Sequence, residues 1–191
     1  MPRQPRETRR HILDAAYELF YKEGFAQTSI DAVAAAAGIT KRTLYYHFDS
    51  KQSLVEAVLG VQHEMMLARI ERWAKRVSGD PANMVEKLFA EFAAWSGQAG
   101  WRGSGFTRAA MEFAASPGHP ARRAARRHKA SVEAWLAEQF AQHGIGAAPR
   151  LARQIMLLIE GCHSLILIHG DRRYAEAASA AARLLVESAR D

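Results

Sequence analysis

The six prolines of this 191-residue chain leave long stretches in which nothing interrupts a helix. They stand at positions 2, 5, 81, 117, 120 and 149, so none falls between residues 6 and 80 or after residue 149. Proline removes a backbone N–H donor and clashes with the preceding helical turn, so proline-free stretches suit uninterrupted helices. Alanine, the best helix former, is the commonest residue, and β-branched residues are comparatively few. The sequence therefore predicts an all-α protein.

The charge and the cysteine content restrict the class of protein. The chain has 26 Lys and Arg against 20 Asp and Glu, a formal net charge of +6, which permits a polyanionic partner. Cys162 is the only cysteine, so an intramolecular disulfide is excluded and a cytoplasmic location is expected. No apolar stretch follows the N-terminus, which argues against a secretory signal. The most apolar segment, 155–168, is short and contains Glu160 and His163, so we expect no membrane partner.

Apolar periodicity and capping residues predict four helices in the first 77 residues or so. The first has one apolar face, can open at Pro5 and can end at Gly24. Its apolar face comprises Ile12, Ala15, Ala16, Leu19 and Phe20. Thr28-x-x-Asp31, a variant of the capping box, predicts a short helix over about 29–37. Thr40 is the expected N-cap of a helix over 41–48, and Ser50 that of a long helix from residue 51 to about Val77.

The remaining chain predicts five more helices, at 82–96, 105–115, 120–143, 150–169 and 173–189, separated by glycine- and proline-rich loops. We expect a three-helix helix-turn-helix domain over residues 1–60, with the motif at about 29–48. A helical C-terminal domain is expected over residues 61–191.

Two short helices joined by a glycine-containing turn are typical of a helix-turn-helix motif. The predicted outward face of the second helix carries cations, a hydroxyl, two phenols and an imidazole, namely Lys41, Arg42, Thr43, Tyr45, Tyr46 and His47. Such groups suit phosphates and base edges in a major groove. Lys51 and Thr28 fall at helix N-termini, where the helix dipole favours a phosphate. The alternative is that Tyr45 and Tyr46 lie in a core.

Residues 7–60 resemble the N-terminal domain of TetR-family transcriptional regulators. The matching stretches are Ile12-Leu13-Asp14-Ala15-Ala16, Leu19-Phe20, Gly24-Phe25, Thr28-Ser29-Ile30, Ala37-Gly38-Ile39, Thr43-Leu44-Tyr45-Tyr46-His47-Phe48 and Ser50-Lys51. The resemblance implies a homodimer that binds a palindromic double-stranded DNA operator. In similar families the commonest arrangement is a repressor that a small effector releases from DNA. It also implies DNA contacts, mainly to the backbone, by Thr28, Thr40, Tyr45, Tyr46, His47 and Lys51. Arg42 departs from the small residue common in the family, so the operator preference does not carry over.

Resemblance weakens after about residue 60, where we expect a lipophilic effector to bind. Large apolar side chains in this region can line a cavity or simply fill the core, and the candidates are Trp95, Phe106, Met111 and Trp135. Three polar residues lie within otherwise apolar stretches, namely Glu112, Glu160 and His163. Burying them requires hydrogen bonds, either in a pocket or at an interface.

The last two predicted helices are candidates for a dimer interface. Segment 150–169 is apolar on nearly every side and must be covered on both faces. Segment 173–189 carries small alanines beside Leu184 and Leu185, which allows another helix to approach closely. The alternative is that both segments are internal core helices.

No motif predicts an enzyme, a metal site or a cofactor. His63-Glu64 begins a zinc-protease pattern, but Leu67 stands where the second histidine is needed. Glu160-x-x-His163 is a single motif where a bundle di-iron site needs two. Gly103-Ser104-Gly105 lacks the surroundings of a nucleophile elbow or a dinucleotide fingerprint. The competing hypotheses are a helical DNA-binding protein without small-molecule control and, less favoured, a helical-bundle enzyme.

Overall fold

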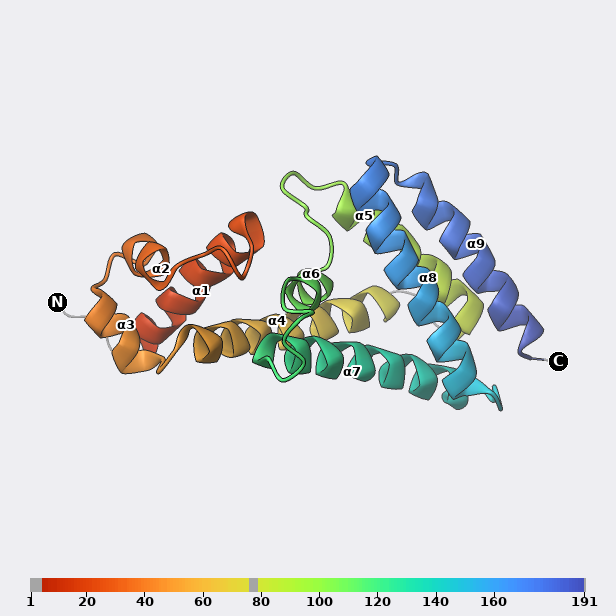
Figure 1. The fold of residues 1–191 in the computed structure, drawn as a ribbon. Coiled ribbons are helices and arrows are strands. Elements are labelled where there is room, and N and C mark those ends of the chain that lie inside the picture. Colours follow the sequence, from red (N-terminus) through yellow and green to blue (C-terminus); the bar gives the residue numbers. More distant parts are fainter. Residues whose placement is uncertain (1–4, 76–78, 191) are drawn as a thin grey trace. The chain divides into compact units, whose positions relative to one another are not determined.

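The computed structural model describes residues 5–75 and 79–190, and within these ranges it consists of α-helices without a β-strand. The prediction of an all-α fold is confirmed. The helices, shown in Figure 1, are α1 (Pro5–Glu23), α2 (Ile30–Ala36), α3 (Lys41–His47), α4 (Lys51–Ala74), α5 (Pro81–Ser96), α6 (Gly105–Glu112), α7 (Pro120–Gln142), α8 (Ala148–His169) and α9 (Arg173–Ser188). The predicted end of the fourth helix, Val77, lies outside the described residues.

Side-chain caps begin the two short helices. Ser29 Oγ accepts a hydrogen bond from the backbone N–H of Ala32 at 3.0 Å, and Thr40 Oγ1 accepts from Thr43 N–H at 3.1 Å. The cap of α3 is the predicted one, whereas the prediction that Thr28 begins α2 is wrong by one residue. Between the helices, Gly38 has φ +61°, a left-handed conformation that strains residues with a Cβ. Cap and glycine together fix the turn.

The chain divides into two compact units, one comprising residues 1–64 and 104–128 and the other residues 65–103 and 129–191. The core of the first unit combines α1–α4 with α6 and the first turns of α7. Its fully buried residues from the N-terminal stretch include Ile12, Ala16, Phe20, Val33, Leu44 and Leu54. Phe106, Ala109, Ala121, Ala124 and Ala125 join them from the later stretch. Residues that are distant in sequence therefore complete the helix-turn-helix core.

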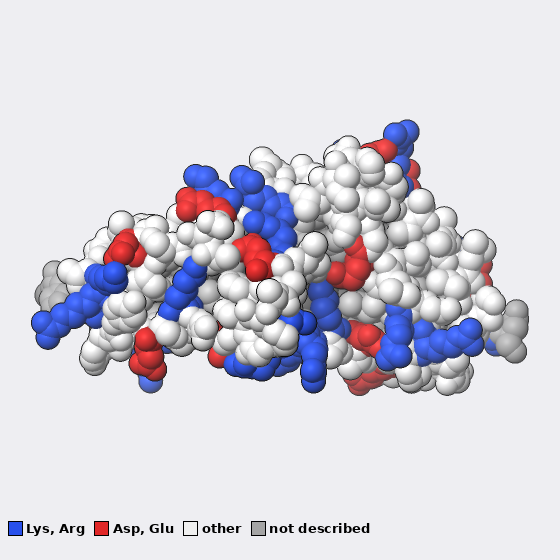
Figure 2. Space-filling view, viewed as in Figure 1, with Lys and Arg blue, Asp and Glu red and all other residues white. Residues whose placement is uncertain are grey.

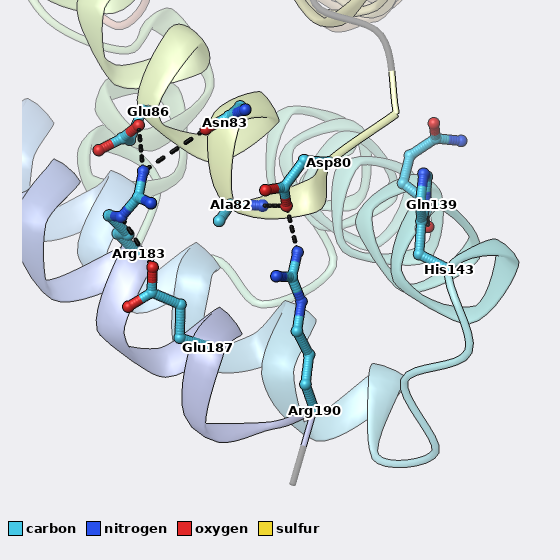
Figure 3. A network of polar contacts seen from close by, with 9 residues as sticks. All are labelled: Asp80, Ala82, Asn83, Glu86, Gln139, His143, Arg183, Glu187 and Arg190. Carbon is cyan, nitrogen blue, oxygen red and sulfur yellow. Dashed lines mark hydrogen bonds and ion pairs between the residues drawn. The ribbon is translucent and has the colours of Figure 1, made fainter.

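The second unit is built around α5, α8 and α9. Helix α9 packs along α5 and against α8, and its small residues Ala178 and Ala182 lie in the shared core (Figure 1). Ion pairs hold α9 to α5 at its edge (Figure 3). Arg183 Nη1 lies 2.8 Å from Glu86 Oε2, and Arg190 pairs with Asp80, the N-cap of α5.

Our predicted domain limits, 1–60 and 61–191, describe sequence regions rather than packing units, and they remain a prediction. Packing follows a different line, because α6 and the start of α7 belong to the same compact unit as α1–α3. Helices α4 and α7 each run from one unit into the other without a break.

Among the described residues, α8 is the one helix that is long and apolar enough to span a membrane by length and composition alone. The apolar segment 155–168 was judged too short for a span, but the helix that contains it has 22 residues. One face of α8 nevertheless packs in the core of the second unit through Leu151, Ile155 and Ile166. Lys129 pairs with Glu160 on the same helix. Because core residues account for part of the apolar character of α8, its length and composition are weak support for a membrane span.

Cys162 lies buried in this core, and burial raises the pKa of its thiol to about 11. Because the thiolate is the reactive form, alkylation by iodoacetamide at pH 8 should be about 100-fold slower than for an ordinary exposed cysteine. Unfolding in urea should restore the ordinary rate, and mass spectrometry measures both. Rapid modification of the folded protein would show that α8 opens readily at this position.

Candidate nucleic-acid interface

Apolar contacts set the geometry of α2 and α3. Val33 on α2 and Leu44 on α3 are fully buried, and Phe48, the C-cap of α3, is nearly so. Replacing a buried leucine such as Leu44 by alanine typically costs about 2–5 kcal/mol, far more than exposed polar contacts contribute. The burial of Leu44 on one side of a seven-residue helix therefore decides which side faces solvent.

The solvent side of α3 carries most of the predicted residues. Tyr46 is 79% exposed and Tyr45 44%, while Lys41 and Arg42 are also exposed. The alternative that the two tyrosines lie in a core is therefore excluded. Thr40 is exposed at the N-cap, whereas Thr43 and His47 are half-buried. The predicted face is thus brought together around four exposed side chains.

Lys41 and Asp31 connect the two helices of the motif. Lys41 Nζ lies 3.0 Å from Asp31 Oδ2, and this hydrogen bond and charge raise the pKa of Lys41. Lys41 therefore stays cationic in the neutral range. Both side chains are exposed, so the pair orients the ammonium without contributing much to stability.

Lys51, the first residue of α4, contacts the loop of residues 24–29 between α1 and α2, which we call the Ala26 loop. Its Nζ donates a hydrogen bond to the carbonyl oxygen of Ala26 at 2.6 Å. Partial burial lowers the pKa of Lys51, and the nearby Glu112 carboxylate acts in the opposite direction. The ammonium is therefore partly committed to holding the Ala26 loop, in addition to any contact with phosphate.

Thr28 is a correction to the predicted interface. Its side chain is only 2% exposed, and its hydroxyl donates to the carbonyl oxygen of Gly24 at 2.7 Å. The hydroxyl therefore closes the loop after α1 and does not face solvent. Ser29, the actual N-cap of α2, is the exposed hydroxyl at this helix end.

Glu112 and Arg108, one turn apart on α6, hold the same loop and the end of α1. Glu112 Oε2 accepts a hydrogen bond from the backbone N–H of Ala26 at 2.7 Å. Arg108 Nη1 donates to the carbonyl oxygen of Tyr21 at 2.8 Å, and its guanidinium lies over the Tyr21 ring. Glu112 was predicted to lie in an effector pocket or at an interface, but its contact is with the loop between α1 and α2. The spacing of Arg108 and Glu112 in the sequence does not indicate that they contact Tyr21 and Ala26, because these partners are remote in the chain.

Two other predicted effector residues also belong to the first unit. Phe106 is buried and stacks on His128 with ring centroids 3.8 Å apart, and His128 Nδ1 lies 3.1 Å from His63 Nδ1. Met111, in contrast, is 72% exposed. Phe106 is thus a core residue and Met111 a surface residue of this unit.

The remaining predicted effector residues lie in the second unit, in two places. Trp95 and His163 both lie against Phe92, at centroid distances of 6.0 and 4.2 Å. Glu160 forms an ion pair with Lys129, as expected for a polar group that needs a partner. Trp135 instead lines a cavity of about 470 Å³ at the start of α5, whose other lining residues include Glu71, Lys75, Asp80, Met84, Glu138 and His143. Trp95 and His163 are not among its lining residues.

A basic cluster near the start of α7 also belongs to the first unit. Its members, Arg122, Arg123, Arg126 and Arg127, lie opposite the buried alanines of that helix. Blue side chains gather over the start of α7 in Figure 2. Arg122 and Arg123 donate to the carbonyl oxygens of Ala114 and Gly118, so both help to close the loop between α6 and α7.

Comparison with known proteins identifies the motif. Residues 12–58 match the family model described as bacterial regulatory proteins of the tetR family. Over the whole chain, the fold matches a TetR-family transcriptional regulator from Streptomyces coelicolor, with a TM-score of 0.87, 25% identity and 97% of each chain covered. The family match over residues 12–58 and the full-length likeness in fold support a TetR-family transcriptional regulator. A TetR-family regulator from Agrobacterium tumefaciens has the same fold at 21% identity, with a TM-score of 0.79 and 97% and 98% of the two chains covered.

The N-terminal part of the chain is also similar to curated transcriptional regulators. TtgR of Pseudomonas putida is 38% identical over 90 residues, which are 46% of this chain and 42% of TtgR. AcrR of Shigella flexneri is 33% identical over 86 residues, 44% and 40% of the two chains. The match thus spans less than half the length of these curated relatives. Each is described as an HTH-type transcriptional regulator.

The contact between α6 and the Ala26 loop can be tested directly. Glu112→Ala should speed hydrogen exchange of the Ala26 amide, because the amide loses its acceptor. The midpoint of thermal unfolding should change little, since Glu112 is exposed. Glu112→Gln retains an acceptor oxygen and serves as the control. An Ala26 amide that is equally protected in all three proteins would remove Glu112 from this role.

Proposed function

We propose that this protein is a homodimeric DNA-binding transcriptional regulator, a repressor that a small lipophilic effector releases from a palindromic operator. The observation that supports it best is the exposed face of α3, where Lys41, Arg42, Tyr45 and Tyr46 project from a helix fixed by buried Leu44. The match of residues 12–58 to the tetR family model and the likeness in fold to a TetR-family regulator agree with this function.

In the proposed complex, α3 enters the major groove. Arg42 is exposed and suits a guanine edge or a phosphate, and the hydroxyls of Tyr45 and Tyr46 suit phosphate oxygens. Lys51 and Ser29, at the N-termini of α4 and α2, border the same surface and would contact the backbone. Arg6 and Arg9 on α1 are exposed as well, and Arg9 lies over the Phe48 ring that ends α3. Arg3 lies outside the described residues.

An exposed apolar face on α8 and α9 supports the homodimer. Leu157 is 69% exposed, Ile168 71% and Leu184 66%, and exposed apolar side chains of this size usually mark an interface when they gather on one face. Figure 2 shows a broad, largely uncharged surface over these two helices. The two recognition helices of a dimer can read successive major grooves when they lie about 34–36 Å apart.

The order of elements along the chain supports effector control. The loop 97–104 carries Trp101, which packs among aromatic residues of the second unit, and it leads directly into α6. Helix α6 in turn holds the Ala26 loop and α1 through Glu112 and Arg108. A ligand that displaces Trp101 would therefore pull on the element that positions α2. Such coupling typically changes DNA affinity by about 5–150-fold.

The alternative is DNA binding without small-molecule control. It is favoured if the aromatic rings around Phe92 form only a core, as their centroid distances of about 6 Å would allow. A regulator of this kind would bind operator with the same affinity under all ligand conditions.

Substitutions on α3 test DNA binding. Tyr46→Ala and Arg42→Ala should each weaken operator binding by about 10-fold, the loss expected for one good polar contact. If Arg42 contacts a phosphate, its loss should also lower the slope of log affinity against log salt by about one. A fluorescence anisotropy titration with operator DNA measures both.

The matched control for these variants is Arg150→Ala, which removes an exposed cation from α8. It should leave affinity and salt slope as in the wild type. Full affinity in both α3 variants, or an equal loss in the control, would contradict the assignment of α3 as the recognition helix.

The dimer is tested at the exposed positions. Leu157→Glu combined with Leu184→Glu should give monomers in analytical ultracentrifugation, because four glutamates would meet in a desolvated interface. Leu185 is less suitable, since it packs against the core of its own chain. Met111→Glu changes an equally exposed apolar residue on α6 and should remain dimeric. A dimeric double variant would place the interface elsewhere.

A further inference from the structure

The indole N–H of Trp101 is a buried donor without an acceptor. Among the side-chain nitrogen and oxygen atoms of the described residues, Trp101 Nε1 is the one buried atom that lacks a hydrogen-bond partner. Most buried polar groups in folded proteins are paired, because an unpaired one has lost its hydration without compensation. An acceptor atom at this position would therefore be bound favourably.

Aromatic rings surround this donor. The Trp101 ring centroid lies 6.0 Å from that of Phe92 and 6.2 Å from that of Trp95, and Trp73 lies 6.2 Å from Trp95. The rings come from α4, α5 and the loop 97–104. Such surroundings favour an apolar, preferably aromatic, ligand body over a strongly hydrated one.

His163 adds an acceptor to the same cluster. Its ring centroid is 4.2 Å from that of Phe92, and its Nδ1 lies 2.9 Å from the carbonyl oxygen of Ile159. A carbonyl can only accept, so the proton of the neutral ring is on Nδ1, and Nε2 carries a lone pair. Burial, reinforced by the charge of Lys129, lowers the pKa of His163 to about 4, against the influence of Glu160. The ring is therefore neutral at pH 7.

We propose that Trp101 and His163 form a two-point site for the hydroxyl of a neutral phenol. The phenol oxygen accepts a hydrogen bond from Trp101 Nε1, its O–H donates to His163 Nε2, and its ring packs against Phe92 and Trp95. As the site of the regulator's effector, it rests on the proposed function. The binding step itself requires no DNA.

The pairing of one donor with one acceptor distinguishes a hydroxyl from other polar groups. A carboxylate could accept from Trp101 and approach Arg69, whose guanidinium lies over the Trp95 ring. It has no hydrogen to donate to His163, however, and would carry its charge into an aromatic site. An ether could satisfy Trp101 alone, and a hydrocarbon neither residue.

Four probes of similar size separate these cases: p-cresol, 4-methylanisole, p-xylene and 4-methylbenzoate. The full-length protein is labelled with ¹⁵N and titrated with each probe in the absence of DNA, while the indole N–H signals of its four tryptophans are followed. Trp101→Phe identifies the Trp101 signal. We expect p-cresol to bind at least 10-fold more tightly than p-xylene. It should also move the Trp101 N–H signal downfield, because this N–H then donates a hydrogen bond to the phenol oxygen. 4-Methylanisole should be intermediate.

Two variants test the assigned contacts. Trp101→Phe should bring the affinity for p-cresol close to that for 4-methylanisole or below, without loss of thermal stability, because the unpaired donor is removed. His163→Phe should abolish the preference for p-cresol over 4-methylanisole. Trp135→Phe, which changes a tryptophan at the separate cavity, is the control and should behave as the wild type.

Equal affinities for p-cresol and p-xylene, tighter binding of 4-methylbenzoate, or no binding of any probe at millimolar concentration would overturn the proposal. So would a Trp101→Phe variant that lowers the affinity for all four probes equally, since that points to packing alone. Release of operator DNA by p-cresol is measured separately. A protein that binds p-cresol as described but never binds operator contradicts the proposed function and leaves this site in place.

Discussion

The shared core of the first unit is the constraint on which its surface depends. α2 and α3 are short, with seven residues each, and Phe106, Ala109, Ala121, Ala124 and Ala125 complete the core of α1–α4 from a distant part of the chain. The alanines matter because a helix with small residues on one face can approach its neighbours closely. The orientation of α3 is therefore set by segments that lie beyond residue 100. The sequence of the helix-turn-helix motif alone therefore does not determine its orientation.

The backbone of Ala26 shows the same dependence in detail. Its carbonyl accepts from Lys51 on α4, and its N–H donates to Glu112 on α6. Both partners are charged, and such hydrogen bonds are stronger than neutral ones. A short loop is thus held from two helices, and the N-terminus of α2 is placed by residues 25 and 86 positions away in the sequence. Residues outside the motif therefore help to set its position.

The sequence was most informative where local chemistry determines structure. Gly38, Thr40 and the spacing of Leu44 and Phe48 predicted the turn, the cap and the exposed face of α3, and the helices of the C-terminal region were predicted close to their observed bounds. It failed where the partner is remote. Thr28 matched a cap pattern but is buried, and Phe106 and Glu112 belong with the helix-turn-helix unit. Periodicity reports which residues share a helix face, but not which helix covers that face.

Two continuous helices, α4 and α7, pass from one compact unit into the other, and the chain also crosses at the start of α6. A helix transmits bending and rotation better than a flexible linker, because its backbone hydrogen bonds resist deformation. If an effector controls DNA binding as proposed, the ligand acts by favouring one conformation of these elements over another. The effect on operator affinity cannot exceed that preference, and by linkage operator must change effector affinity by the same factor. A ligand site on the loop 97–104 would directly precede α6 in the chain. Helix α6 contacts both α1 and the Ala26 loop through Arg108 and Glu112, so a small change in the packing of this loop could alter the position of α2.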